Sequence, residues 1–174
     1  MARKQMTPRM PAPYLRRLAF LPEKAQGRTD YPFSLGWLAQ EEFEFDFVAP
    51  VTIFVGENGV GKSTLIEAIA ALAGYDEAGG GKGYAAVDHS AAKDRSGAGL
   101  AEALRAGWLP KVTTGWFFRA ETFFSVARWL DALEGAPPPD FLSHSHGEGF
   151  LRFFDERTRG QGLYILDEPE SALS

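Results

Sequence analysis

The stretch VTIFVGENGVGKSTLIEAIA, residues 51–70, joins a run of strand-forming residues to an apolar helical run through a segment that contains three glycines. Residues 51–55 are the β-branched and aromatic types that favour strands. After the glycines, Leu65, Ile66 and Ile69 recur at helical spacing. We therefore predict a buried strand, a glycine-containing turn and a helix in succession.

The turn, GENGVGKS at residues 56–63, matches the pattern G-x-x-x-x-G-K-[ST] in full. Glycines let backbone N–H groups converge on phosphate oxygens, and the N-terminus of the following helix carries a partial positive charge. We expect Lys62 to reach the β and γ phosphates of a nucleoside triphosphate, Ser63 to bind Mg²⁺, and Thr64 to donate a phosphate hydrogen bond. The predicted phosphate-binding residues are Gly56, Glu57, Asn58, Gly59, Val60, Gly61, Lys62, Ser63 and Thr64.

A second apolar run, LYIL at residues 163–166, ends in the acidic pair Asp167 and Glu168. A phosphate-binding loop needs a metal partner, and an aspartate at the end of such a strand supplies it. The neighbouring Glu168 is placed to orient, or accept a proton from, a water that attacks the γ-phosphate. This pair favours hydrolysis over phosphoryl transfer to a bound acceptor.

Outside these motifs, the pattern predicts an α/β domain at residues 14–174, preceded by a flexible basic tail at 1–13. Residues 78–99 are rich in glycine and small residues, which predicts a mobile loop. The other predicted elements are strands at 14–21, 42–47 and 115–120 and helices at 100–106, 121–134 and 147–157. The first two strands, which precede residues 51–55, are expected to form an antiparallel pair beside a parallel core.

The composition limits the class of protein. The chain has 174 residues, 45% of them hydrophobic, no cysteine and a formal net charge of −5. These values fit one globular domain without disulfides, give no strong nucleic-acid signal, and favour a reducing compartment. The sequence shows no transmembrane run and no signal peptide, so we expect a cytoplasmic protein.

A third motif identifies a family resemblance. The segment SHSHGEGF, residues 143–150, places Ser145 and Gly147 at a predicted loop-to-helix junction, and Gly147 precedes Asp167 by 20 residues. Together with DEPESALS at 167–174, this arrangement resembles the ATP-binding-cassette (ABC) family, whose signature loop precedes an acidic strand end by a similar interval. The chain looks most similar to small soluble ABC-type ATPases that are often labelled AAA-family.

The resemblance covers most of residues 14–174 and implies a P-loop NTPase fold, with antiparallel N-terminal strands and a parallel core flanked by helices. Within it, residues 119–158 form a helical region that carries the signature. Ser145 and Gly147 would contact the γ-phosphate of ATP bound to a second subunit, so ATP would hold a homodimer together. Glu121, in the family's Q-loop, is a candidate magnesium ligand, with Arg119 as a rival polar residue.

The resemblance raises two further expectations. An aromatic residue near the N-terminus should stack on the adenine, with Tyr14, Tyr31 and Phe33 as candidates. In the family, a later strand also lies between the strand before the phosphate loop and the strand that bears the acidic pair. No sequence after Ser174 supplies that strand, so we expect this chain to be a piece of a longer ATPase, incomplete at its C-terminus.

These features predict a soluble ATPase that binds ATP and Mg²⁺ and uses Lys62 and Glu168 in hydrolysis. The ATP-binding subunit of a membrane transporter is an alternative, although the usual signature and Q-loop sequences are absent. A DNA-repair type of ATPase is disfavoured, because no heptad pattern separates Ser63 from Ser145. A module that holds ATP without turnover stays open, and the protein partner is not indicated.

Overall fold

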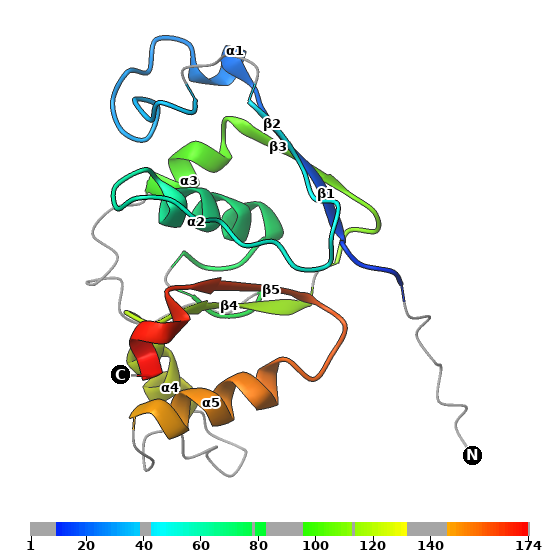
Figure 1. Cartoon of the computed structure of the whole chain (residues 1–174), viewed down its shortest axis with the longest axis vertical. Coiled ribbons are helices and arrows are strands. Elements are labelled where there is room, and N and C mark those ends of the chain that lie inside the picture. The colour runs from blue at the N-terminus through cyan, green and yellow to red at the C-terminus, as the bar shows by residue number, and fades with distance from the viewer. Residues whose placement is uncertain are drawn as a thin grey trace.

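The computed structural model describes residues 10–38, 43–77, 79–82, 96–112, 114–131 and 146–173. Figure 1 shows helices α2 (Lys62–Ala73) and α3 (Ser96–Ala101) between an antiparallel sheet and a parallel strand pair. Helices α4 (Phe123–Asp131) and α5 (His146–Arg157) cover the other face of the parallel pair. The predicted α/β architecture with both kinds of sheet is confirmed at this level.

The antiparallel sheet has the strand order β2–β1–β3. Arg17 of β1 joins the first pair of strands, with Nε 2.7 Å from Asp46 Oδ1 and Nη1 2.9 Å from Glu44 Oε1. Between these exposed acids, Phe45 packs against the core, which is the alternation that the sequence predicts. The bounds are β1 (Leu15–Phe20), β2 (Glu44–Asp46) and β3 (Leu104–Trp108), and the short helix α1 (Pro22–Ala25) follows β1.

The parallel pair consists of β4 (Gly115–Arg119) and β5 (Leu163–Asp167). Its register places Gly115 beside Leu163 at one end and Arg119 beside Asp167 at the other. After β5, the 3₁₀ helix η3 (Pro169–Leu173) turns the chain away from the sheet. The two predicted strands are confirmed, and their carboxyl ends bring a cation and an acid together.

Helix α2 is the central element of the core. Its buried Ala68 and Ile69 belong to the same cluster as Leu18 of β1, Phe117 of β4 and Ile165 of β5. The small alanines of the sequence EAIAALA allow close packing on more than one side of the helix. The end of the glycine loop at residues 56–63 is therefore fixed relative to both sheets.

Aromatic rings fill the second core, between the parallel pair and helices α4 and α5. The ring centroid of Phe153 in α5 lies 5.3 Å from that of Trp116 and 5.5 Å from that of Phe118, both in edge-to-face geometry. The ring centroid of Phe123 in α4 lies 5.4 Å from that of Phe153. Such aromatic pairs stabilise the fold by more than the burial of their apolar surface alone would.

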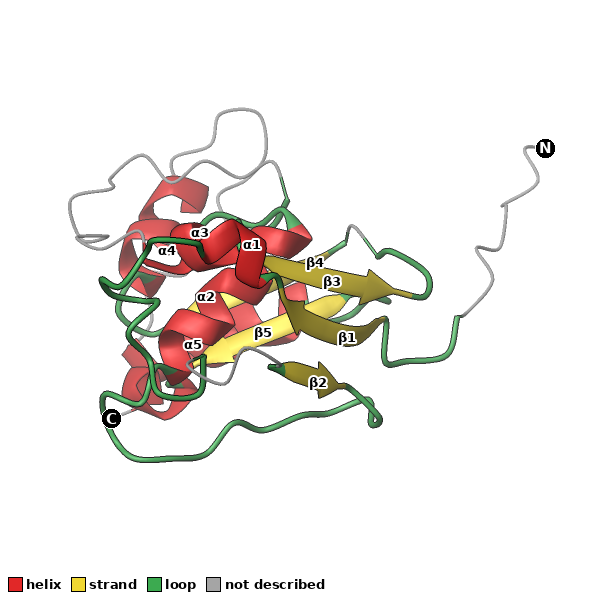
Figure 2. Ribbon diagram, turned by 90° about the horizontal axis from the view of Figure 1, so that it is seen from above, coloured by secondary structure: helices red, strands yellow, loops and turns green. Residues whose placement is uncertain are grey.

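The predicted buried strand at residues 51–55 is wrong. These residues form no strand in the part of the chain that the structure describes, and they are drawn as loop in Figure 2. Val51, Ile53 and Val55 are 75%, 78% and 85% exposed. Residues 51–54 and strand β5 line a common groove of about 690 Å³ instead of pairing with each other. Strand-forming side chains therefore do not produce a strand here, because none of the described strands pairs with this backbone.

The predicted helix at 100–106 is only half correct. Helix α3 ends at Ala101, and residues from Leu104 onward form β3, which pairs with β1 from Leu104–Phe20 to Trp108–Leu15. The edge of β1 offers backbone hydrogen bonds, and this tertiary pairing overrides the local helix preference of the segment.

Two short parts of the predicted mobile loop at 78–99 lie in the described residues, at 79–82 and 96–99, and both make ordered backbone contacts. Gly80 exchanges two 2.9 Å backbone hydrogen bonds with Phe117 of β4, and residues 96–99 already belong to α3. A Cβ on Gly81 would lie 3.1 Å from the ring of Trp116, so glycine permits this close approach. Residues 83–95 lie outside the described part of the chain.

We expect Phe153→Ala to lower the free energy of unfolding by about 3–5 kcal/mol, because the substitution leaves a cavity among packed rings. Leu151→Ala is the control on the same helix. Leu151 is 55% exposed, and its replacement should change the free energy by no more than about 0.5 kcal/mol. Urea denaturation followed by tryptophan fluorescence measures both values, and similar small losses would contradict the assigned core.

Candidate functional site

The predicted phosphate loop lies immediately before α2, with residues 56–60 exposed. Gly59 and Gly61 have φ angles of 82° and 90°, which residues with a Cβ rarely adopt. Space is also limited at Gly61, where a Cβ would lie 2.7 Å from Leu35 Cδ1 and 3.3 Å from Trp37 Nε1. The backbone conformation therefore favours glycine at both positions, and packing adds a second reason at Gly61.

The start of α2 offers backbone donors to an anion. The first hydrogen bond of the helix runs from Leu65 N to Gly61 O at 3.0 Å, so the N–H groups of residues 62–64 have no acceptor in a preceding turn. These donors and the helix dipole create positive potential beside the exposed loop.

Lys62 bends back over the loop. Its Nζ donates to Gly56 O at 2.9 Å and to Glu57 O at 2.7 Å. The ammonium group is thus held by neutral carbonyl oxygens at the place where the sequence predicts a phosphate contact. An anion that enters the loop can exchange with these acceptors.

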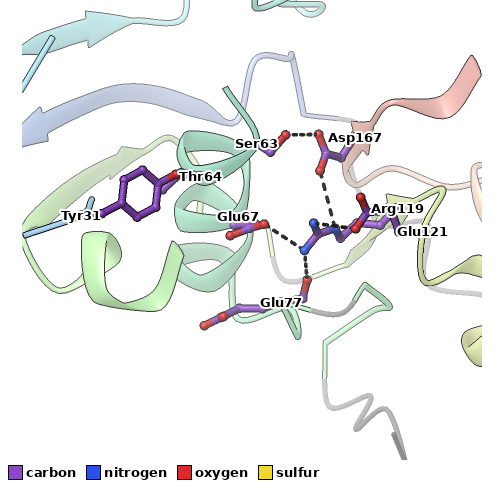
Figure 3. A network of polar contacts seen from close by, with 8 residues as sticks. All are labelled: Tyr31, Ser63, Thr64, Glu67, Glu77, Arg119, Glu121 and Asp167. Carbon is purple, nitrogen blue, oxygen red and sulfur yellow. Dashed lines mark hydrogen bonds and ion pairs between the residues drawn. The ribbon is translucent and has the colours of Figure 1, made fainter. Parts of the chain in front are cut away.

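Ser63 and Asp167 meet although 104 positions separate them in the sequence. Ser63 Oγ donates to Asp167 Oδ1 at 3.0 Å, which joins the first turn of α2 to the end of β5 (Figure 3). Asp167 is buried, at 8% exposure, and is held there by the register of the parallel pair.

This donor set fits Mg²⁺. Magnesium in nucleotide sites takes one or two protein oxygens, and phosphate and water provide the rest. Ser63 and Asp167 provide a hydroxyl and a carboxylate at the entrance to the helix N-terminus. Among the residues that the structure describes, no cluster of three or more His, Cys, Asp or Glu side chains is arranged to hold a metal.

A buried cation lies next to this pair. Arg119, at the end of β4, places Nη1 2.9 Å from Glu67 Oε1 and Nε 3.5 Å from Asp167 Oδ2. Burial raises the pKa of the Glu67 carboxyl, and the Arg119 charge partly opposes this shift. Sequence reasoning missed Glu67. Glu67 could have been found in the sequence as a charged residue on the largely apolar face of a predicted helix. A charge that is buried in this way requires a buried partner.

The other acidic candidates lie in different environments. Glu121 is 3.6 Å from Arg119 Nη2 with a side chain that is 75% exposed, and the structure shows it facing the guanidinium rather than Ser63. Glu168 is exposed, and it lines the groove that Lys62, Ser63 and Asp167 also line. Its φ of 47° is unusual for a non-glycine residue, and such conformations concentrate at functional sites.

Residues 31–37 cover one side of the loop, which the sequence did not indicate. Tyr31 OH contacts Thr64 Oγ1, and the hydroxyl of Thr64 is buried in this contact (Figure 3). The expected phosphate bond from the Thr64 side chain is therefore not available in this conformation, whereas its backbone N–H is. Trp37 Nε1 donates to Val60 O at 2.9 Å.

The three candidate adenine-stacking aromatics differ in exposure. Tyr31 is 51% exposed, whereas Tyr14 and Phe33 are each only 9% exposed. The guanidinium of Arg28 lies 4.0 Å from the ring centroid of Phe33 and covers that face. Of the three rings, that of Tyr31 is therefore the most accessible.

The predicted signature residues fall at the start of α5. Gly147 is in the first turn of this helix and is partly exposed. Ser145 lies outside the described residues, so its position relative to Gly147 stays a prediction.

A comparison with known proteins agrees with the glycine loop. Residues 34–101 match the family model described as AAA domain. This range contains the loop, α2 and Glu67, while Arg119 and Asp167 lie beyond it. No curated protein and no solved structure matches the chain. The match supports, at a coarse level, a P-loop ATPase of the AAA type.

None of the helices in the described ranges is long and apolar enough to cross a membrane.

Glu67 predicts a pH dependence of stability. A carboxyl whose pKa is raised by folding stabilises the protein most below its ordinary value of 4.5, and that contribution is lost as the pH rises through the raised pKa. Glu67→Gln removes this titration. The free energy of unfolding of the wild type, relative to the variant, should therefore fall between pH 4.5 and neutral pH. Urea titrations of both proteins measure it, and a constant or rising difference would contradict the dominance of burial.

Proposed function

We propose that this chain binds ATP together with Mg²⁺ and hydrolyses it to ADP and phosphate. The observation that carries the proposal is the 3.0 Å contact between Ser63 Oγ and Asp167 Oδ1 at the N-terminus of α2. It combines two hard oxygen ligands with the backbone donors of an anion site. The AAA-domain match over residues 34–101 supports nucleotide binding independently of this contact.

In this proposal, binding begins at the loop. The amides of residues 62–64 and the Lys62 ammonium group receive the β and γ phosphates, and Lys62 leaves the carbonyls of Gly56 and Glu57 to do so. Ser63 and Asp167 hold the metal. When bound, Mg²⁺ withdraws charge from the phosphate oxygens and stabilises the charge that develops during transfer.

Glu168 is the proposed general base. Its carboxylate accepts a proton from water as the water oxygen bonds to the γ-phosphorus, while the bond from that phosphorus to the bridging oxygen of ADP breaks. The positive φ of Glu168 supports this role, since it turns the chain away directly after the buried Asp167. The Glu168 carboxylate is thereby separated from that of Asp167, which holds the metal in this proposal.

The proposal includes an ATP-dependent homodimer. Helix α5 has 12 residues, and its first turn contains the partly exposed Gly147. A helix N-terminus of this kind attracts the γ-phosphate of a nucleotide held by another copy. Gly147, with the preceding Ser145, would then complete the site in trans.

Lys62→Ala should weaken ATP binding by about tenfold to a hundredfold, because a charge-assisted phosphate contact contributes about 1.5–3 kcal/mol. Isothermal titration calorimetry with ATP and Mg²⁺ measures the change. Lys24→Ala, at the last turn of α1, is the matched control and should bind as the wild type does. Unchanged affinity in the Lys62 variant would remove the basis for the proposed function.

Glu168→Gln should lower the hydrolysis rate by about 10²–10⁴-fold while ATP binding persists, because the amide cannot accept the proton. Phosphate release measures turnover, and calorimetry measures binding. Light scattering should also show a dimer of this variant in ATP but not in ADP.

Glu170→Gln is the control for this experiment, since Glu170 is also exposed and lies two positions further along the chain. It should retain wild-type turnover. If the Glu168 variant hydrolyses ATP at the wild-type rate, then Glu168 is not the base. If it binds ATP and stays monomeric, the dimer is wrong while the nucleotide site stands.

A further inference from the structure

Arg119 is a nearly buried cation surrounded by acids from three separate segments. Its side chain is 14% exposed and lies 2.9 Å from Glu67 on α2, 3.5 Å from Asp167 on β5 and 3.6 Å from Glu121 beyond β4. Nη1 also donates to the carbonyl of Glu77 at 3.2 Å (Figure 3). The guanidinium is therefore anchored from several directions.

Asp167 connects this cation to the candidate metal site. Its Oδ1 accepts the hydrogen bond from Ser63, and its Oδ2 faces Arg119 Nε. A divalent ion bound between Ser63 and Asp167 would share the Asp167 carboxylate with the positively charged guanidinium of Arg119.

We propose that Arg119 is a positioning residue that serves as the resident counter-cation of the magnesium site. It neutralises Asp167 in the nucleotide-free protein and keeps free divalent cations from binding there. The metal then enters with the triphosphate, whose negative charges offset the repulsion. This inference rests on the proposed binding of ATP and Mg²⁺.

The charges in the network support this role. With both carboxyl groups ionised, Arg119 leaves the group formed with Glu67 and Asp167 with one net negative charge, whereas its removal would leave two. Electrostatic interactions are stronger in a partly buried site than in water, and the side chains of Glu67 and Asp167 are 8% and 10% exposed. A site without Arg119 would attract a divalent cation in the absence of nucleotide.

Glu67 controls how strongly Arg119 acts on Asp167. Its contact with the guanidinium, at 2.9 Å, is shorter than the 3.5 Å contact of Asp167. Without the Glu67 charge, Arg119 would shift its interaction toward Asp167. Removal of Glu67 and removal of Arg119 should therefore change metal affinity in opposite directions, whereas a purely structural clamp predicts the same direction for both.

The test is Mn²⁺ binding to the full chain without nucleotide, measured by electron paramagnetic resonance. Arg119→Gln should raise the affinity by about tenfold, which is the usual size of outer-partner effects at metal sites. Glu67→Gln should lower it. The double variant should return close to the wild type, because an ion pair is replaced by two neutral side chains. Arg119→Lys keeps the charge and should also stay close to the wild type.

Equal affinities in all variants, or shifts of the same sign in the two single variants, would overturn the inference. If Arg119→Gln alone does not fold, the comparison of Glu67→Gln with the double variant answers the same question. The double variant does not leave Glu67 as an unpaired buried carboxylate, and its Asp167 keeps the hydrogen bond from Ser63. Calorimetry of the wild type with ATP and Mg²⁺ separates the two hypotheses. Absence of ATP binding would refute the proposed function, whereas ATP binding with unchanged Mn²⁺ affinities would refute only the role of Arg119.

Discussion

The hydrogen bond from Ser63 to Asp167 joins the end of the glycine loop to the parallel strand pair. It depends on two constraints that arise separately. The register of β4 and β5 sets the position of Asp167 along the strand pair, and the core around α2 sets the position of Ser63. A change in either would separate the two oxygens, so packing far from the loop determines whether the loop can work with a metal ion.

The local parts of this site could be predicted from the sequence. The loop, the strand that ends in Asp167 and the helices on either side follow from patterns that extend over fewer than about 20 residues. At Gly61 the structure even adds a second reason for the residue type, because Leu35 and Trp37 occupy the space beside it. Short patterns of this kind predict the local backbone conformation, because residue type directly limits the backbone angles that a residue can adopt.

The non-local parts could not be predicted in the same way. Residues 51–55 have the composition of a strand, but a strand also needs a neighbouring backbone, and that information is not in the segment itself. Leu104–Trp108 is the opposite case, since the local sequence there contributes to a predicted helix, but pairing with β1 makes the segment a strand. The contact of Glu67 with Arg119 likewise depends on how α2 lies against β4, and the sequence offered only a buried charge that required some partner.

The bent conformation of Lys62 has a consequence for how the site receives its ligand. By donating to the carbonyls of Gly56 and Glu57, the lysine closes the loop into a ring. The loop thus has its shape in advance, and association requires one side chain to swing outward rather than a flexible segment to become ordered. Such preorganisation reduces the entropy lost on binding and leaves more of the contact energy as affinity.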